Sequence, residues 1–507
     1  YGFETETFAG AGDALRSLYY NYPGIIITDI KMPKLDGIKM SKLIKEFDQN
    51  AKIIVITAFN DSEYLFECIK INIDNYITKP LDIYHLLEVL SKLAKSVCLE
   101  KENKDPLLKG LKVIDAASFI AGPSAATIMS DYGAEVIKIE PESGDSLRNL
   151  ISNGRMPEGP ENYCWELTSR NKKSISLNLK DQEAHKILIN LVKEADVFIT
   201  NMPFPVRKKL NITVEDIRPH NPSLIYASLT GYGEVGPDAD RTAYDSMAWW
   251  ARSGLMDFVR PSNSHPVAWS TPGMGDHPTG MALYGAIMTA LYKRERTGEG
   301  SEVSTSLMAN GAWANGVFIQ AALMNIEFPE RPEPLPRHPF YDFYSTKDNR
   351  EFALGMINSR IEWPKLISIL NRTDWETREL FSFDDPFANA DTIRTELSEE
   401  FKSRDLNVID NLLRDSGVTY GVLGRTTDHA HDKQFLETET LVPLEHESFE
   451  NLMTINSPFR IEEEEKVEFS RAPKVGEHTK EVLKEMGFKD TDLEELKNNK
   501  SIFWSDI

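Results

Sequence analysis

A carboxylate between glycines stands directly before a long helical pattern. Asp276 belongs to the run Gly273-Met-Gly-Asp-His-Pro-Thr-Gly280, and the residues that follow, 281–294, have the composition of a helix. An aspartate in this place can cap the helix, whose positive end also favours a carboxylate anion. The flanking glycines, Gly275 among them, let backbone N–H groups approach a developing oxyanion. By spacing alone a helix cap is the simpler role, and a nucleophile is compatible with it.

A second group of polar side chains lies in the first hundred residues. Short apolar runs lead into Asp29, Thr57 and Lys79, with amphipathic helical patterns between them. This alternation is typical of a parallel α/β sheet, on which ligands bind beyond the carboxyl ends of the strands. Each residue alone is most simply a turn residue, whereas the three together form a candidate ligand site.

The chain from Leu111 onward repeats the alternation of strands and helices. A charged stretch at 100–105 predicts a linker, and the proline-rich stretch 330–339 cannot form a regular element. The expected strands and helices of this part are strands over 111–115, 136–139, 197–200 and 224–228, and helices over 181–195, 277–296 and 479–486, the last of which closes the chain.

The composition limits the classes of partner. The 507 residues are 41% hydrophobic and carry a net charge of −22, which predicts several globular domains that repel nucleic acid. No apolar run reaches the ~18 residues of a membrane span, and no signal peptide is visible. The three cysteines are far apart and form no zinc or disulfide pattern, so a reducing cytoplasmic setting is expected. Because residue 1 is not a methionine, we expect the sequence to begin inside a longer protein.

One glycine pattern points to a cofactor that we do not expect. The run Gly231-Tyr-Gly-Glu-Val-Gly236 has the spacing of a dinucleotide-binding turn and follows a predicted strand. That motif must open a helix, whereas Pro237-Asp-Ala-Asp240 predicts a turn. The sequence therefore predicts no NAD site here.

From about residue 107 to the end, the chain resembles the class III CoA-transferases, the family of formyl-CoA transferase and carnitine CoA-transferase. The segment Gly273–His277 is most similar to the branch that acts on 2-hydroxy acids. The motifs that carry the resemblance occur in the family's order and are Leu111–Asp115, Ala121-Gly-Pro123, Asp131–Glu140, Asn171–Ser174, Leu177–Lys180, Thr230–Gly233, Arg241–Asp245, Gly275-Asp-His277, Ala472-Pro473 and Gly476–Thr479.

The resemblance implies that Asp276 is the nucleophile in a transfer of CoA from an acyl-CoA to a carboxylic acid, without a metal. Tyr244, Asp245 and Gly275 would lie beside the reacting centre, although the first two also suit a helix start. Coenzyme A, as a substrate, would contact positions that could equally be surface charges, turns or core. These positions are Ile120, Ala121, Leu177, Lys180, Asn201, Lys209 and Arg241.

The sequence departs from formyl-CoA transferase at two positions. An active-site glutamine of that enzyme is Ile120 here, and its CoA-contacting arginine is Pro141. No glycine run precedes Phe352–Gly355 either. We therefore expect a larger or branched acid, specifically a 2-hydroxy acid, in place of formate or oxalate. Trp249 and Trp250 either line this pocket or belong to the core.

The first hundred residues resemble the receiver domain of response regulators. The matching text is Thr28–Pro33, Thr57-Ala58 and Thr78-Lys-Pro80, with Tyr76 at an aromatic switch position. The resemblance implies that Asp29 accepts phosphate while Thr57 and Lys79 bind its oxygens. The chain begins after the family strand that ends in a Mg²⁺-binding acidic pair, so we expect a truncated receiver with little phosphorylation. Whether this fusion is genuine or an assembly artefact stays open.

The expected architecture is α/β: a truncated flavodoxin-like receiver, then the Rossmann-like large domain and smaller α+β domain of an intertwined homodimer. Two alternatives remain open. An α-methylacyl-CoA racemase would need a histidine base where Ala243 stands, and a receiver-regulated CoA-binding signalling protein would need a complete receiver. The expected domains are 1–98 for the receiver, 99–106 for a linker, 107–330 for the large domain, 331–432 for the small domain and 433–507 for a C-terminal segment that returns to the large domain.

Overall fold

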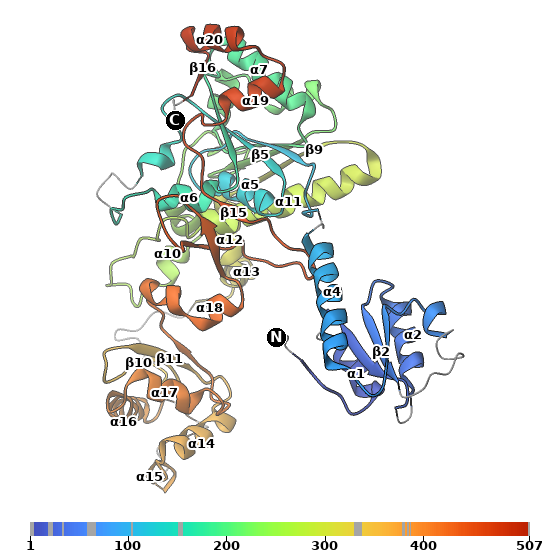
Figure 1. The fold of residues 1–507 in the computed structure, drawn as a ribbon. Coiled ribbons are helices and arrows are strands. Elements are labelled where there is room, and N and C mark those ends of the chain that lie inside the picture. The colour runs from blue at the N-terminus through green and yellow to red at the C-terminus, as the bar shows by residue number, and fades with distance from the viewer. Residues whose placement is uncertain are drawn as a thin grey trace. The chain divides into compact units, whose positions relative to one another are not determined.

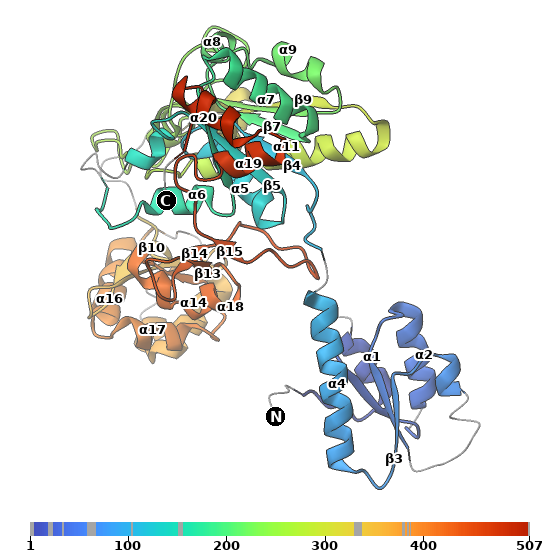
Figure 2. The same ribbon diagram turned by 45° about the horizontal axis from the view of Figure 1, so that its top comes forward.

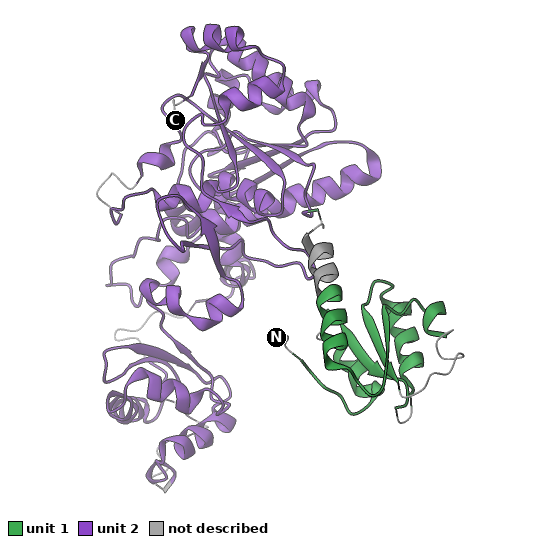
Figure 3. Cartoon of the chain, viewed as in Figure 1, with its two compact units in different colours: residues 1–105 green, residues 106–507 purple. Residues whose placement is uncertain are grey.

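The structure is a computed structural model in which the chain divides into two compact units, residues 1–105 and 106–507 (Figure 3). The proline-rich stretch 330–336 and the receiver-motif residues Pro33 and Ala58 lie outside the described residues. No helix in the described part of the chain is long and apolar enough to cross a bilayer. The described residues are 5–18, 24–32, 35–57, 67–102, 105–150, 156–328, 337–377, 381–382, 385 and 387–504.

The first unit is built on a parallel three-stranded sheet in the order β1-β2-β3. The apolar run of β2 places Ile53, Ile54 and Val55 in the fully buried centre of this sheet. The parallel sheet confirms the expected α/β class. Helix α4 continues to Glu102 and so occupies the first residues of the predicted linker. The elements of this unit are α1 (Ala11–Leu18), β1 (Ile26–Asp29), α2 (Gly37–Phe47), β2 (Ile53–Thr57), β3 (Asn75–Thr78) and α4 (Ile83–Glu102).

The second unit contains a seven-stranded sheet in the order β16-β6-β5-β4-β7-β8-β9. All neighbours are parallel except the short edge strand β16, which is antiparallel to β6. Strand β7 is buried along its whole length, as its uninterrupted apolar run predicts. The strands of this sheet are β4 (Lys112–Asp115), β5 (Glu135–Glu140), β6 (Lys173–Leu177), β7 (Val197–Thr200), β8 (Ile225–Thr230), β9 (Ser301–Ser306) and β16 (Ile502–Phe503).

Helices cover both faces of this sheet (Figures 1 and 2). Alternate residues of each strand enter different cores, so Val113 packs with α5 and α11 while Ile114 packs with α7, α19 and α20. The helical elements are α5 (Ala121–Asp131), η1 (Ser146–Asn149), α6 (Tyr163–Ser169), α7 (Gln182–Glu194), α8 (Phe204–Lys209), α9 (Val214–Ile217), η3 (Arg218–His220), the π-helical turn η4 (Ser246–Ala251), α10 (Leu255–Phe258), α11 (Asp276–Thr297), α12 (Leu307–Ala314), α13 (Gly316–Leu323), α19 (Thr479–Glu485) and α20 (Asp490–Asn498).

Residues 337–470 add two small sheets, β10-β11-β12 and β14-β13-β15. The first is antiparallel and has its own core, in which Phe352, Leu397 and Phe401 are fully buried. The elements of this region are β10 (Tyr341–Ser345), β11 (Glu351–Gly355), α14 (Ser359–Leu370), α15 (Asp374–Thr377), α16 (Ala390–Lys402), α17 (Leu406–Leu413), β12 (Tyr420–Val422), η5 (Thr426–His431), α18 (Lys433–Glu437), β13 (Leu441–Glu445), β14 (Met453–Ile455) and β15 (Phe469–Ser470).

The chain does not close with the predicted helix near 479–486. Helix α20 and strand β16 follow it, and Ile502 of β16 pairs with Leu177 of β6. Thr479 fixes the junction, because its hydroxyl accepts the Ser176 N–H at 3.0 Å and donates to the Phe503 carbonyl at 2.8 Å. Residues 502–503 are therefore part of the central sheet of the second unit.

Candidate active site

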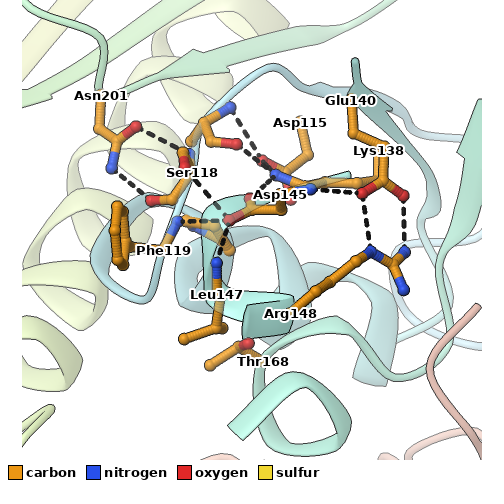
Figure 4. Close-up of polar contacts among 12 residues, drawn as sticks. Asp115, Ser118, Phe119, Lys138, Glu140, Asp145, Leu147, Arg148, Thr168 and Asn201 are labelled. Carbon is orange, nitrogen blue, oxygen red and sulfur yellow. Dashed lines mark hydrogen bonds and ion pairs between the residues drawn. The ribbon is translucent and has the colours of Figure 1, made fainter. Parts of the chain in front are cut away.

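The candidate site lies at the point of the large sheet where the order of successive strands reverses. Strand β4 is central, with β5 and β6 on one side and β7, β8 and β9 on the other, so the connections after β4 and β7 diverge. The connection after β4, residues 116–120, leads into α5. Asn201, directly after β7, accepts the Ser118 N–H at 2.8 Å and donates to the Ser118 carbonyl at 2.6 Å (Figure 4). The amide of Asn201 thus joins the two connections.

Asp276 is the first residue of α11, and Gly275 occupies the cap position that we predicted for Asp276. The reason is steric: a Cβ at Gly275 would lie 2.5 Å from Trp249 Cγ, so the turn runs directly against the indole. A Cβ at Gly280 would lie 2.5 Å from the Ala121 carbonyl oxygen. Helix α11 therefore crosses the start of α5 in close contact, which brings Asp276 to the end of the sheet where α5 begins.

The Asp276 carboxylate is partly buried, and no hydrogen bond to it occurs in the described residues. Burial, with a further contribution from the charge of Asp245, raises the pKa of Asp276 to about 7. Both effects oppose the positive field at the start of α11, which by itself would lower the pKa of Asp276. Asp245 itself is buried and accepts the Ser246 N–H at 2.6 Å and the Gly275 N–H at 3.4 Å. Asp245 therefore holds the backbone turn at Gly275, directly before Asp276.

The side chains around this turn are aromatic or apolar. Tyr244 is 58% exposed and meets Phe119 edge-on, with ring centroids 5.5 Å apart. A Cβ at Gly273 would lie 2.9 Å from His277 Cδ2 and 3.9 Å from Ile120 Cδ1, so these two side chains flank the turn. Burial lowers the pKa of His277, with a smaller contribution from the charge of Arg170. The sequence offered no sign of a role for Phe119.

The remaining predicted CoA positions differ in exposure. Lys180 and Lys209 are exposed. No contact in the described residues joins them to residues 273–276, which we call the Asp276 turn. Arg241 is exposed, pairs with Asp238 at 2.8 Å and lies over the Tyr232 ring. Ala121 and Leu177 are both buried.

The structure also shows the glycine run 231–236 and the two neighbouring tryptophans, Trp249 and Trp250. No helix follows Gly231–Gly236: the described residues 237–240 form a turn, as predicted. Trp249 and Trp250 are buried in the core between α5 and α11, and Trp250 Nε1 donates to the Ala268 carbonyl at 2.8 Å. Trp249 therefore belongs to the core and lies against Gly275.

In the first unit, Asp29, Thr57 and Lys79 meet at the carboxyl edge of the sheet. Lys79 Nζ donates to Asp29 Oδ2, and the Lys79 N–H donates to the Thr57 carbonyl at 2.7 Å. Burial opposes ionisation of Asp29, but the Lys79 ammonium and the Lys31 N–H together hold its pKa below the usual range. No cluster of three or more metal-ligating side chains occurs in the described residues of either unit.

Comparisons with known proteins match each of the two units to a family. The model of CoA-transferase family III matches residues 108–479, and that of the response regulator receiver domain matches residues 1–91. The (R)-2-hydroxy-4-methylpentanoate CoA-transferase of Clostridioides difficile is 32% identical over 404 residues, 78% of this chain and 99% of that protein. The cinnamoyl-CoA:phenyllactate CoA-transferase of Clostridium sporogenes is 32% identical over 407 residues, with 79% and 98% covered.

A solved structure supports the same conclusion for the fold. A CAIB/BAIF family protein from Brucella suis superposes with a TM-score of 0.67 at 26% identity and covers 76% of this chain and 100% of its own. The family match covers residues 108–479 of the second unit, a range that includes Asp276 and the glycines before it. The chain therefore belongs to CoA-transferase family III and carries an N-terminal response regulator receiver domain.

Proposed function

We propose that this CoA-transferase uses Asp276 as its nucleophile and a 2-hydroxy acid as one of its substrates. The observation that carries the proposal is a partly buried carboxylate at the start of α11, beside a second carboxylate and two glycines. The substrate class is supported by the printed activities of the two relatives at 32% identity, one of which acts on a 2-hydroxy-4-methylpentanoate and one on phenyllactate.

The proposed reaction exchanges one thioester for another, so no ATP is required. Asp276 attacks the thioester carbonyl of the donor, and the C–S bond breaks. CoA leaves as a thiolate, and a mixed anhydride of Asp276 and the acyl group remains. The thiolate attacks the aspartyl carbonyl, which releases the donor acid and forms an aspartyl-CoA thioester. The acceptor acid attacks that thioester, and the thiolate released then attacks the acceptor's acyl carbon. The products are the new acyl-CoA and a free Asp276 carboxylate.

The surroundings of Asp276 suit this sequence of steps. A pKa of about 7 leaves roughly half of the molecules ionised at neutral pH, so the nucleophile is present without a metal. The indole of Trp249 behind Gly275 restricts water, which would hydrolyse the anhydride and the thioester. Backbone N–H groups of the glycine turn are the nearest candidates to stabilise the oxyanions.

Binding of CoA requires positive charge for its phosphates. We assign this role to Lys180, Lys209 and Arg241, which are all exposed. Ile120, Ala121, Leu177 and Asn201 would line the path to Asp276. We further propose that the reaction takes place in the cytoplasm.

A homodimer is proposed from an apolar surface on two consecutive helices. Helix α13 has no buried residue, and the exposed side chains on and near α12 and α13 include Trp313 at 87% and Val317 at 78% exposure. Apolar patches of this kind are covered by another protein surface, here a second copy of the chain. Sedimentation velocity is expected to give a dimer, and a monomer at micromolar concentration would contradict this part of the proposal.

The racemase alternative lacks a base in the place expected for it. Ala243 occupies that position, and its Cβ packs against the backbone of Gly231. An alanine cannot remove an α-proton, so the transferase is favoured.

Trapping of the covalent intermediate tests the nucleophile. The protein is incubated with an acyl-CoA panel and hydroxylamine, and the peptide that contains Asp276 is analysed by mass spectrometry. A hydroxamate at Asp276, with acyl exchange lost in Asp276→Asn, is expected. Asp490→Asn is the matched control, because Asp490 likewise begins a helix but is exposed. Washout of the α-proton in D₂O without acyl exchange would favour the racemase. Absence of the hydroxamate, of acyl exchange and of proton washout would reject the transferase.

A further inference from the structure

We propose that Phe119 determines acyl specificity and that Asp145 is the positioning residue that holds it, an inference that rests on the proposed function of Asp276. The ligand class is a branched or aromatic acyl chain without a second charged group. Phe119 lies in the connection between β4 and α5, directly before Ile120.

The backbone of Phe119 is in an unfavourable conformation. Its φ is +62°, in the left-handed region that a bulky aromatic residue rarely adopts. Residues in this region persist where the surrounding structure fixes them, and they concentrate at ligand sites. The conformation therefore requires a specific set of contacts.

Asp145 supplies those contacts (Figure 4). Its Oδ1 accepts the Phe119 N–H at 3.1 Å, the Ser118 hydroxyl at 3.1 Å and the Leu147 N–H at 2.9 Å. On the other side of the connection, Asn201 holds both backbone groups of Ser118. The two residues before Ile120 are thus fixed from both sides.

Asp145 is fixed in turn by a buried ionic network. Lys138 is fully buried, lies 3.0 Å from Asp145 and 3.7 Å from Asp115, and donates to the Ala117 carbonyl. Lys172 pairs with Asp115 at 2.9 Å, so two lysines balance two aspartates. Such a network stabilises one arrangement of the loop, because any displacement would leave a buried charge unpaired.

The loop contacts both segments that adjoin the nucleophile. Phe119 meets Tyr244, whose neighbour Asp245 holds Gly275, and Ile120 lies against the turn at Gly273. An acyl group attached to Asp276 would therefore extend along an aromatic and branched apolar wall. A carboxylate at the far end of that acyl group would be placed against this apolar wall, whose residues offer it no charged partner, and this disfavours dicarboxylic acids.

The test compares kcat/KM for 4-methylpentanoyl-CoA, acetyl-CoA and glutaryl-CoA in wild type, Phe119→Gly and Phe119→Ala. Wild type is expected to prefer the branched donor. Both variants are expected to reduce the ratio of branched to acetyl donor by about tenfold or more, the scale of a lost apolar contact. The glycine variant tolerates a positive φ, so it should melt at a higher temperature than the alanine variant. The control Tyr292→Ala, an exposed aromatic of α11, should leave the ratio unchanged.

Asp145→Asn tests the positioning role, since asparagine retains an acceptor but loses the pair with Lys138. It is expected to lower the same ratio, and to have no additional effect on the ratio in a Phe119→Gly background. If Asp145→Asn does not fold, the two Phe119 variants still decide the inference.

Three outcomes would overturn the inference about Phe119. An unchanged ratio in Phe119→Gly, or a wild-type preference for glutaryl-CoA, would reject Phe119 as the determinant while transfer through Asp276 stands. Absence of transfer from every donor in wild type would instead reject the proposed function, and this inference with it.

Discussion

The two units each present an aspartate beside the end of a parallel sheet, in opposite electrostatic settings. Asp29 is partly exposed, and its pair with Lys79 helps to hold its pKa below the usual range. Asp276 lies beside a second carboxylate, has no cation partner in the described residues, and has a pKa of about 7. The comparison shows that the same side chain becomes a stable anion or a group that titrates near neutrality according to burial and neighbours.

The largest effect is expected on acyl transfer when Asp276, and not Asp29, is replaced. Asp276→Asn removes the nucleophile and is expected to lower acyl transfer by about 10⁴-fold or more. Steady-state exchange of labelled CoA between two acids measures the loss. A reduction of less than about tenfold would mean that Asp276 is not the nucleophile.

The next largest effect is expected on the stability of the second unit when Lys138 is replaced. Lys138→Met leaves Asp145 and Asp115 short of a buried positive charge and is expected to destabilise the second unit by about 3–5 kcal/mol. Urea unfolding followed by tryptophan fluorescence measures this change, because Trp249 and Trp250 lie in that unit. A loss below about 1 kcal/mol would show that the network is not energetically coupled.

A smaller effect follows from the raised pKa of Asp276. A carboxyl group whose folded-state pKa is raised stabilises the fold less as pH rises from its unfolded value of 3.8 through about 7. Asp276→Asn is therefore expected to be more stable than wild type by about 1–3 kcal/mol at pH 8. The difference should disappear as pH falls toward 4, as measured by melting temperature at several pH values. A difference that grows on acidification would contradict the sign.

The smallest effect is expected at the exposed pair of the first unit. Lys79→Met removes the partner of Asp29, yet both side chains are more than one-third exposed, so a loss of only about 0–1 kcal/mol is expected. The stability that the lowered pKa of Asp29 contributes is present above its unfolded value and is lost as pH falls through the folded value. Acid titration of both proteins by circular dichroism tests this, and equal sensitivity to acid would contradict it.

Phosphoryl transfer to Asp29 remains a prediction from resemblance. Incubation with acetyl phosphate and Mg²⁺, with Asp29→Asn as the control, measures it by the mass of the first unit. The sequence led us to expect little labelling, and stoichiometric labelling would make a receiver-regulated enzyme the better description.

The sequence predicted those elements whose pattern is local. Strand β7 is an uninterrupted apolar run, and α11 has a glycine turn before it, so both were found within a residue or two. Strand β9 reads Ser-Glu-Val-Ser-Thr-Ser and β16 has two residues, and neither pattern indicates a strand. Their conformation depends on neighbouring strands that are distant in sequence.

The same distinction applies to the site. The Asp276 turn was recognisable because glycines, an aspartate and a helix start are adjacent in sequence. The left-handed backbone of Phe119 was not, because it depends on Asp145, 26 positions later, and on Asn201. The raised pKa of Asp276 likewise depends on burial and on Asp245, which only the folded chain brings together.

The pairing of β16 with β6 has a consequence for synthesis on the ribosome. Residues 173–177 leave the ribosome long before residues 502–503, the strand that pairs with their edge. At about 5–20 residues per second, β6 presents an open edge for on the order of tens of seconds, while the first unit can already fold. During that interval the nascent second unit would be the part of the chain most in need of a chaperone.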